Sequence, residues 1–296
     1  MALAYLDLSA GIGAALVAAT GVGLTIGAGT YSARWPTSQI YGRTLIAPRN
    51  PGEIALTFDD GPNPRWTPLL LETLAQHEIQ ATFFLMGKYA SQQPDLVRRM
   101  HRAGHLIGNH TWNHPDLAMT DALRTRDELT RTSAELESIL GSPVRYFRPP
   151  FGSRRPATLR IARELGLTPV MWNAMTTDWS STSPDQVTPR LARLVEKHSR
   201  QGWASTIVLH DGGHLTLEAD RSASVAAAGQ LITRFATTSS PPVMTCSERP
   251  SNPWNSWQSA PSRAPAFSSS SAASFPSSSP AGSRADAAPR ATCKTR

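Results

Sequence analysis

Short apolar segments alternate six times with longer segments of helical periodicity between Gly52 and Phe235. The apolar segments span 53–58, 81–86, 105–109, 144–147, 169–174 and 206–210, and several are flanked by Gly or Pro. The helical segments span 68–77, 94–103, 121–140, 155–165, 184–200 and 219–235. Six consecutive strand–helix units predict an α/β fold with a parallel sheet covered by helices. Counting the units does not decide whether the sheet closes into a barrel.

The N-terminal end of the chain is strongly apolar. The stretch from Leu8 to Ser32 contains no charged residue, and it exceeds the length of about 20 residues that crosses a bilayer. We therefore expect a hydrophobic signal or membrane anchor over 1–33, and with it a cell-envelope location, either anchored or secreted. A buried Gly/Ala-rich helix is the alternative. The arginines that follow the stretch favour a cytoplasmic C-terminal side, so the orientation stays open.

The C-terminal end has a low-complexity composition. From residue 237 to 296 the sequence is rich in Ser, Ala and Pro and lacks apolar periodicity, which predicts a tail behind a folded domain at 34–236. The tail carries six cations and two anions, so it holds +4 of the formal net charge of +7. The remaining +3 is spread over the domain without a basic stripe, which argues against nucleic-acid binding. Both cysteines, Cys246 and Cys293, lie in the tail, so a thiolate metal site in the domain is excluded.

Polar residues suited to chemistry come directly after the predicted strands rather than within the helices. They are Asp59, Asp60, His110, Arg148, Asp178 and His210. In α/β barrels the carboxyl ends of the strands and their loops converge on one rim, where active sites are built. We therefore expect these six residues, although distant in sequence, to meet at that rim.

Two motifs suggest a metal site. Asp59 and Asp60 end an apolar strand, and two carboxylates this close repel each other unless a cation or a proton separates them. His110 and His114 are four residues apart, and with one carboxylate they form a set that leaves room for water on a catalytic zinc ion. Taken singly, each motif has an ordinary alternative: an Asp-Gly turn at a strand end, and a pair of surface histidines.

Two further motifs suggest groups for hydrolysis. Arg148-Pro-Pro-Phe151-Gly is a rigid turn that can direct a backbone N–H at a developing oxyanion. His210 ends an apolar strand, and with a carboxylate to orient it this residue has the form of a general acid or base. The alternatives are a Pro-rich loop with a surface arginine and a rim histidine without a catalytic role.

Five segments together resemble the polysaccharide deacetylase family, also called the NodB homology domain or carbohydrate esterase family 4. The segments TFDDGP, HTWNH, RPPFG, DW and IVLHD occur in the family's order and at similar spacing, over about residues 34–235. The resemblance implies a distorted (β/α) barrel of about seven strands. It also implies a divalent metal, commonly zinc, with cobalt or another divalent ion as an alternative.

The resemblance also implies a role for each matching residue. Asp60, His110 and His114 would bind the metal, Asp59 would be the general base, and Arg148 would hold Asp59. His210 would protonate the leaving amine and would be oriented by Asp178. The backbone N–H of Phe151 would stabilise the oxyanion, and Trp179 and Leu209 would line the pocket for the acetyl methyl group.

Two features depart from the family pattern. Met175 stands where the fourth motif usually has an acidic residue. Near the C-terminus the family has a final apolar strand, whereas this chain offers only residues 242–246 before the low-complexity tail. We therefore expect a barrel that lacks a regular last strand.

The expected function is the hydrolysis of N-acetyl groups on a polysaccharide that contains GlcNAc, such as peptidoglycan, a chitin-like chain or a chitooligosaccharide. An amide needs an activated water, a Lewis acid and a proton for the leaving nitrogen, and the five motifs offer a group for each need. The alternatives are an O-acetyl esterase that uses the same site, a carbohydrate-binding pseudoenzyme, and a barrel that folds poorly because of its tail. We expect a monomer whose partner is the N-acetylated saccharide.

Overall fold

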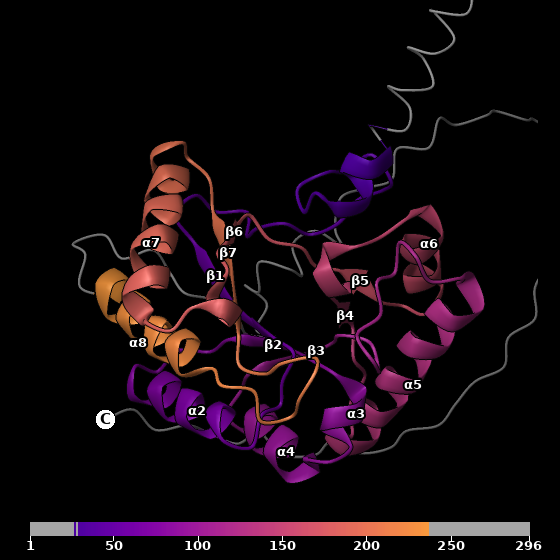
Figure 1. The fold of residues 1–296 in the computed structure, drawn as a ribbon, viewed down its shortest axis with the longest axis horizontal. Coiled ribbons are helices and arrows are strands. Elements are labelled where there is room, and N and C mark those ends of the chain that lie inside the picture. Colours follow the sequence, from indigo (N-terminus) through magenta and orange to yellow (C-terminus); the bar gives the residue numbers. More distant parts are fainter. Residues whose placement is uncertain (1–26, 28, 237–296) are drawn as a thin grey trace, which may run out of the picture. The chain divides into compact units, whose positions relative to one another are not determined.

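The computed structural model describes residue 27 and residues 29–236. Within this part of the chain seven strands form one sheet in which every neighbouring pair is parallel. The strands are β1 (Ile54–Asp59), β2 (Thr82–Leu85), β3 (Leu106–Asn109), β4 (Tyr146–Phe147), β5 (Thr168–Pro169), β6 (Ala174–Met175) and β7 (Ser205–His210). Their order in the sheet is β5-β4-β3-β2-β1-β7-β6. Figure 1 shows the strands inside a ring of helices.

The six predicted helices are confirmed, with ends shifted by at most three residues. They are α2 (Trp66–Gln76), α4 (Pro94–Arg102), α5 (Ala122–Leu140), α6 (Pro156–Glu164), α7 (Pro184–Arg200) and α8 (Ser222–Ala236). The structure adds a helical stretch over residues 29–34, α3 (Gly87–Ala90) and the 3-10 turns η1 (Pro150–Gly152) and η2 (Asp178–Ser180). Helix α5 shows how local sequence sets the bounds. The Asp121 carboxylate accepts the N–H of Arg124 at its start, and Gly141, with φ 67°, ends it.

One predicted strand is wrong. The segment 169–174 does not form a single strand, because its two ends lie on opposite edges of the sheet, in β5 and β6. Residues 170–173 connect these edges, and the five residue steps from Pro169 to Ala174 span at most about 18 Å. Leu45 pairs with Val170 beside this connection.

The two edges are therefore close to each other, and the sheet is a curled half-barrel, as the distorted (β/α) barrel predicted from the sequence requires.

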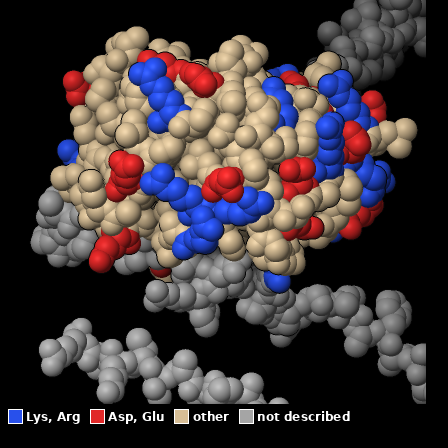
Figure 2. All heavy atoms as spheres, turned by 90° about the horizontal axis from the view of Figure 1, so that it is seen from below, with Lys and Arg blue, Asp and Glu red and all other residues tan. Residues whose placement is uncertain are grey.

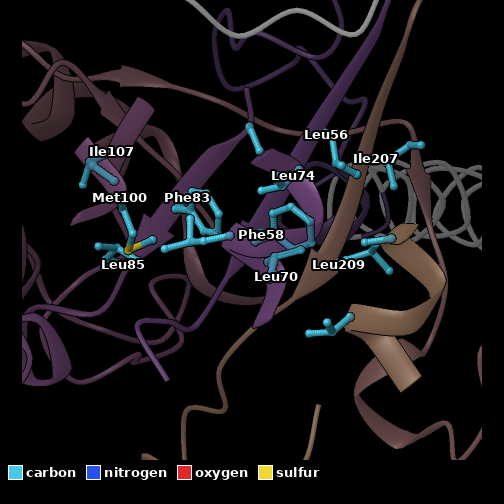
Figure 3. Close-up of a cluster of buried hydrophobic side chains, with 14 of the residues drawn as sticks. Leu56, Phe58, Leu70, Leu74, Phe83, Leu85, Met100, Ile107, Ile207 and Leu209 are labelled. Atoms are coloured by element: carbon cyan, nitrogen blue, oxygen red, sulfur yellow. The ribbon is translucent and has the colours of Figure 1, made fainter. Parts of the chain in front are cut away.

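The sheet separates two environments. In β1 and β7, Leu56, Phe58, Ile207 and Leu209 belong to the main hydrophobic core between the strands and the helices, which Figure 3 shows in close-up. The intervening positions face the interior of the half-barrel, since successive side chains of a strand point to opposite faces. This face carries polar side chains at the ends of the strands, and it positions the site described below.

Several predictions concern residues outside the described part. The low-complexity tail at 237–296, the strand candidate at 242–246 and most of the N-terminal segment at 1–33 all fall there. Among the described residues, no helix is both long and apolar enough to span a membrane. On the face in Figure 2, basic and acidic side chains lie next to one another. The absence of nucleic-acid binding stays a prediction.

A candidate active site at the strand ends

The polar residues predicted to meet do so at the carboxyl ends of the strands. They surround a pocket of about 270 Å³. Its lining residues are Asp59, Asp60, His110, His114, Phe151, Trp172, Met175, Trp179, Val208, His210, His214 and Arg221. Arg148 and Asp178 lie behind this lining, where each binds a residue that reaches the pocket.

Asp60, His110 and His114 form a compact buried group. Oδ1 of Asp60 lies 3.4 Å from Nε2 of His110 and 3.1 Å from Nε2 of His114. One nitrogen or oxygen atom from each of the three residues lies within 4.8 Å of those of the other two. Burial alone would raise the pKa of Asp60, but the neighbouring imidazoles of His110, His114 and His214 hold it well below its ordinary value. The carboxylate is therefore ionised in this site.

The hydrogen bonds of this group fit a bound cation. Nδ1 of His110 lies 2.8 Å from the carbonyl oxygen of Arg148, which can only accept, so Nδ1 carries the proton. Nε2 of His110 then faces Oδ1 of Asp60, a buried oxygen that has no hydrogen-bond partner among the described residues. Burial also lowers the pKa of His114 despite the opposing effect of Asp60, which favours the neutral ring that metal binding requires. One carboxylate oxygen and two imidazole nitrogens that converge in a buried group are the ligand types of a metal site.

A buried glutamate that the sequence analysis missed holds the His110–His114 loop. Oε2 of Glu128, in α5, accepts the backbone N–H groups of Trp112 and Asn113, both at 2.8 Å. Oε1 accepts the side-chain amide of Asn113 at 3.1 Å. His114 itself has φ 60°, in the left-handed region, and its N–H donates to Oγ1 of Thr111 at 3.0 Å. These contacts turn His114 back toward Asp60.

Asp59 belongs to a separate, equally buried pair. Nη1 of Arg148 donates to Oδ1 of Asp59 at 2.7 Å and to Oγ1 of Thr57 at 2.8 Å. The same guanidinium donates to the carbonyl oxygens of Val170 and Met171, both at 3.2 Å. Arg148 thereby joins β1 to the connection between β5 and β6, and its fully buried guanidinium fixes the position of the Asp59 carboxylate.

His210 and Asp178 form the third group. Nδ1 of His210 lies 3.0 Å from Oδ1 of Asp178, and Oδ2 of Asp178 accepts the backbone N–H of His210 at 2.8 Å. Ser224, in α8, donates to the same Oδ2 at 2.7 Å. Burial alone would lower the pKa of His210, but the charge of Asp178, its hydrogen bond and the charges of Asp60 and Asp59 raise it to about 9. His210 is therefore protonated at neutral pH.

Of the predicted substrate-binding residues, the structure brings two to the pocket. Phe151 has φ 57° and is 53% exposed, and its ring meets that of His114 edge-on at 4.6 Å. Trp179 packs edge-on against His210 at 5.0 Å. Leu209 is fully buried in the main core and is absent from the pocket lining, where its neighbour Val208 lies instead. The expected contact of Leu209 is therefore wrong, because strand residues alternate between faces.

Three more residues at the site escaped the sequence analysis. His214 lines the pocket, Arg221 donates to the carbonyl of Gly212, and Asp211 is buried beneath Gly61 with a hydrogen bond from Thr67. Burial, together with the charges of Asp60 and Asp59, raises the pKa of Asp211 to about 7. The sequence offers one signal for His214, its position four residues after His210, the last residue of β7.

Comparisons with known proteins support the same assignment. The sequence profile of the family described as "Polysaccharide deacetylase" matches residues 47–170. A chitooligosaccharide deacetylase from Azorhizobium caulinodans is 35% identical over 177 residues, which cover 58% of this chain and 80% of the relative. The chain belongs to the polysaccharide deacetylase family.

Another relative of this deacetylase family member is named for a different substrate. A peptidoglycan-N-acetylglucosamine deacetylase from Bacillus cereus is 38% identical over 177 residues. The match covers 59% of this chain and 62% of that relative, so the chain spans less than two thirds of its length. Names of both kinds support polysaccharide deacetylase activity for this chain.

Solved structures match the fold of this family member. The Bc1960 peptidoglycan N-acetylglucosamine deacetylase has a TM-score of 0.59 at 34% identity, covering 70% of this chain and 94% of that chain. BA3943 from Bacillus anthracis, described as a CE4 family pseudoenzyme, has a TM-score of 0.56 at 27% identity, covering 62% and 60% of the two chains. The fold alone therefore does not establish turnover, and the residues of the site must carry that argument.

Proposed function

We propose that this chain is a metal-dependent hydrolase that removes N-acetyl groups from polysaccharides or oligosaccharides containing GlcNAc. One observation carries the proposal. A buried Asp-His-His group, a carboxylate held by a buried arginine and an imidazole paired with a second carboxylate all border a single pocket. Amide hydrolysis needs these three kinds of group together: a Lewis acid, a base for water and an acid for the leaving nitrogen.

Asp60, His110 and His114 would hold the metal. Two imidazole nitrogens and one carboxylate oxygen, with further positions left open, fit zinc, and cobalt is an alternative with similar ligand preferences. When bound, the ion supplies Lewis acidity, which lowers the pKa of water and draws charge from a carbonyl oxygen.

Asp59 is the proposed general base. Its carboxylate accepts a proton from the water whose oxygen attacks the amide carbon. The buried guanidinium of Arg148 keeps one carboxylate oxygen fixed at 2.7 Å, and Oδ2 of Asp59 lies on the side of His110, 3.9 Å from its Nε2. The base is therefore oriented toward the pocket before the substrate arrives.

His210 is the proposed general acid. The carbon–nitrogen bond breaks once the nitrogen is protonated, which leaves acetate and the free amine. Because Asp178 accepts the hydrogen bond from Nδ1 of His210, the proton on Nε2 is the one available to the pocket. The pKa of about 9 keeps this proton in place at neutral pH.

The retained site argues against a carbohydrate-binding pseudoenzyme. Asp59, Asp60, His110, His114 and His210 are all present, and all line the pocket. Oxygen-linked acetyl groups are the main alternative substrate, since the same water attack would cleave an ester. We further propose a cell-envelope location, on the basis of the uncharged segment from Leu8 to Ser32. The monomeric state stays a prediction.

A substrate screen tests the proposal. Acetate release is measured from GlcNAc oligomers, peptidoglycan and acetylxylan, each with added zinc or cobalt. We expect release from at least one of the two N-acetylated substrates and a lower kcat/KM on acetylxylan. Release from acetylxylan alone would identify an O-acetyl esterase. No release from any substrate by a folded, metal-loaded chain would support the pseudoenzyme.

A further inference from the structure

His214 lines the pocket of the metal-binding group, and the mechanism above gives it no role. Its imidazole stacks on that of His114, with ring centroids 4.6 Å apart and planes inclined by 18°. Its Nδ1 lies 3.8 Å from Oδ2 of Asp60, an ion-pair distance. Oδ1 of the same carboxylate faces His110 and His114. The two oxygens of Asp60 therefore face different imidazoles.

Contacts on both sides hold the loop that carries His214. The carbonyl oxygen of His214 accepts from Nζ of Lys88 at 3.3 Å and from the hydroxyl of Tyr89 at 3.4 Å, both in α3. Preceding it, the carbonyl of Gly212 accepts from Nε of Arg221. A Cβ atom on Gly213 would lie 2.5 Å from Cβ of Ala219, so the loop is packed closely there. The backbone thus fixes where this partly exposed imidazole lies.

The other rings at the pocket mouth reinforce this position. Phe151 meets His214 edge-on, with centroids 5.6 Å apart, while it also contacts His114. His214 is therefore confined between Phe151, His114 and the carboxylate of Asp60. A histidine that served only as a polar surface residue would not be held on all three sides.

We propose that His214 is a positioning residue of the metal site, an inference that rests on the metal-dependent function proposed above. Its Nδ1 faces Oδ2 of Asp60 at 3.8 Å and limits where that oxygen can move, and its ring covers one face of His114. Oδ1 of Asp60 and Nε2 of His114 thereby stay directed at the position of the cation. Partners that orient metal ligands in this way typically change metal affinity by about 10–100-fold when they are removed.

Cobalt binding to the full chain tests this role independently of turnover. Metal-stripped wild-type chain and variants are titrated with Co²⁺, and both affinity and the visible absorption spectrum are recorded. His214→Ala is expected to weaken Co²⁺ binding by about 10–100-fold and to alter the spectrum. His214→Asn keeps an N–H donor and is expected to recover part of the affinity, whereas His214→Phe keeps only the stacking and is not. His101→Ala, at an exposed position in α4, is the matched control and should bind as the wild type does.

Two results would overturn the inference. The first is a His214→Ala chain that binds Co²⁺ as tightly as the wild type with the same spectrum. The second is rescue by Phe and not by Asn, because the contact with Asp60 would then be irrelevant. A wild-type chain that binds no Co²⁺ would refute both this role and the metal-dependent function. Normal binding without acetate release would refute the deacetylase function alone.

Discussion

Asp59 and Asp60 are neighbours in sequence and have different partners because the backbone turns between them. Asp59 is the last residue of β1 and faces Arg148, as a regular strand position does. Asp60 has φ 69°, in the left-handed region, so its carboxylate turns toward His110 and His114. The turn allows two adjacent carboxylates to serve one pocket, one as a base and the other as a metal ligand.

The different roles of Asp59 and Asp60 predict a specific phenotype for Asp59→Asn. The amide keeps the size of the side chain and removes its basicity, so acetate release should fall by about 10²–10⁴-fold. Zinc content should stay at the wild-type level, because Asp60, His110 and His114 are untouched. Steady-state acetate release and metal analysis of the same preparation check both parts, with Asp95→Asn on the exposed surface of α4 as the control. Wild-type turnover in Asp59→Asn would rule out the base assignment.

The proposed general acid, His210, predicts how activity depends on pH. His210 must be protonated to act, and its pKa is raised to about 9, so activity should persist at neutral pH and fall as pH rises through that value. The raised pKa of His210 also stabilises the folded state, because protonation is more favourable there than in the unfolded chain. This contribution to the free energy of unfolding is fully present below the ordinary histidine pKa of about 6.5. It is lost as pH rises through the folded-state pKa. In Asp178→Asn the alkaline limb of kcat/KM should move to lower pH. An unmoved limb would show that Asp178 does not set this pKa.

The sequence predicted those site residues that belong to recognisable motifs. Asp59, Asp60, His110, His114 and His210 all reach the pocket, and Arg148 and Asp178 stand behind them. Glu128 and His214 could not be found in the same way, because only the fold brings α5 to the His110–His114 loop and the segment after β7 to Asp60. Leu209 was misplaced because the motif does not show which face of β7 is the pocket face.

At the scale of elements, α5 supports the metal site through one residue. Glu128→Ala would leave the N–H groups of Trp112 and Asn113 without their buried acceptor, at a cost of about 2–5 kcal/mol in the free energy of unfolding. We also expect weaker zinc binding, because His114 lies in the same loop. Urea unfolding and zinc titration measure the two effects. Asp127→Ala, exposed on the same helix, should change neither. If Glu128→Ala and the wild type had equal free energies of unfolding, Glu128 would not be what holds the His110–His114 loop.

The elements themselves were largely predictable, with one instructive exception. Apolar runs and helical periodicity identified six helices and five of the seven strands near their observed bounds. The sixth apolar run, 169–174, divides between the two edges of the sheet. An apolar pattern records burial, and residues 170–172 are buried whether they lie in a strand or in the connection between strands. The division therefore required knowledge of how the sheet curls.

At the scale of the molecule, the seven strands and the residues of the site all precede residue 237. A chain truncated after Ala236 is therefore expected to keep the zinc affinity and acetate release of the full chain. Its thermal unfolding temperature should also be unchanged. Expression of the two chains side by side, followed by these three measurements, is the check. A truncated chain that is insoluble or inactive would show that residues beyond 236 complete the fold.

Arg148 links the proposed base to the connection between the two edges of the sheet, because it binds Asp59 in β1 and the carbonyls of Val170 and Met171. The closure of the half-barrel and the orientation of the proposed base thus depend on the same side chain. This coupling gives a reason for the full burial of the charged Arg148 side chain.

The proposed chemistry rests on a divalent metal beside these oriented groups. The most direct test is acetate release from a chitooligosaccharide by the full chain, measured after metal removal with a chelator and again after zinc is restored. We predict that release disappears with the metal and returns with zinc. Release that continues in the metal-stripped chain, or that fails to return in a folded chain that has bound zinc, would contradict the account.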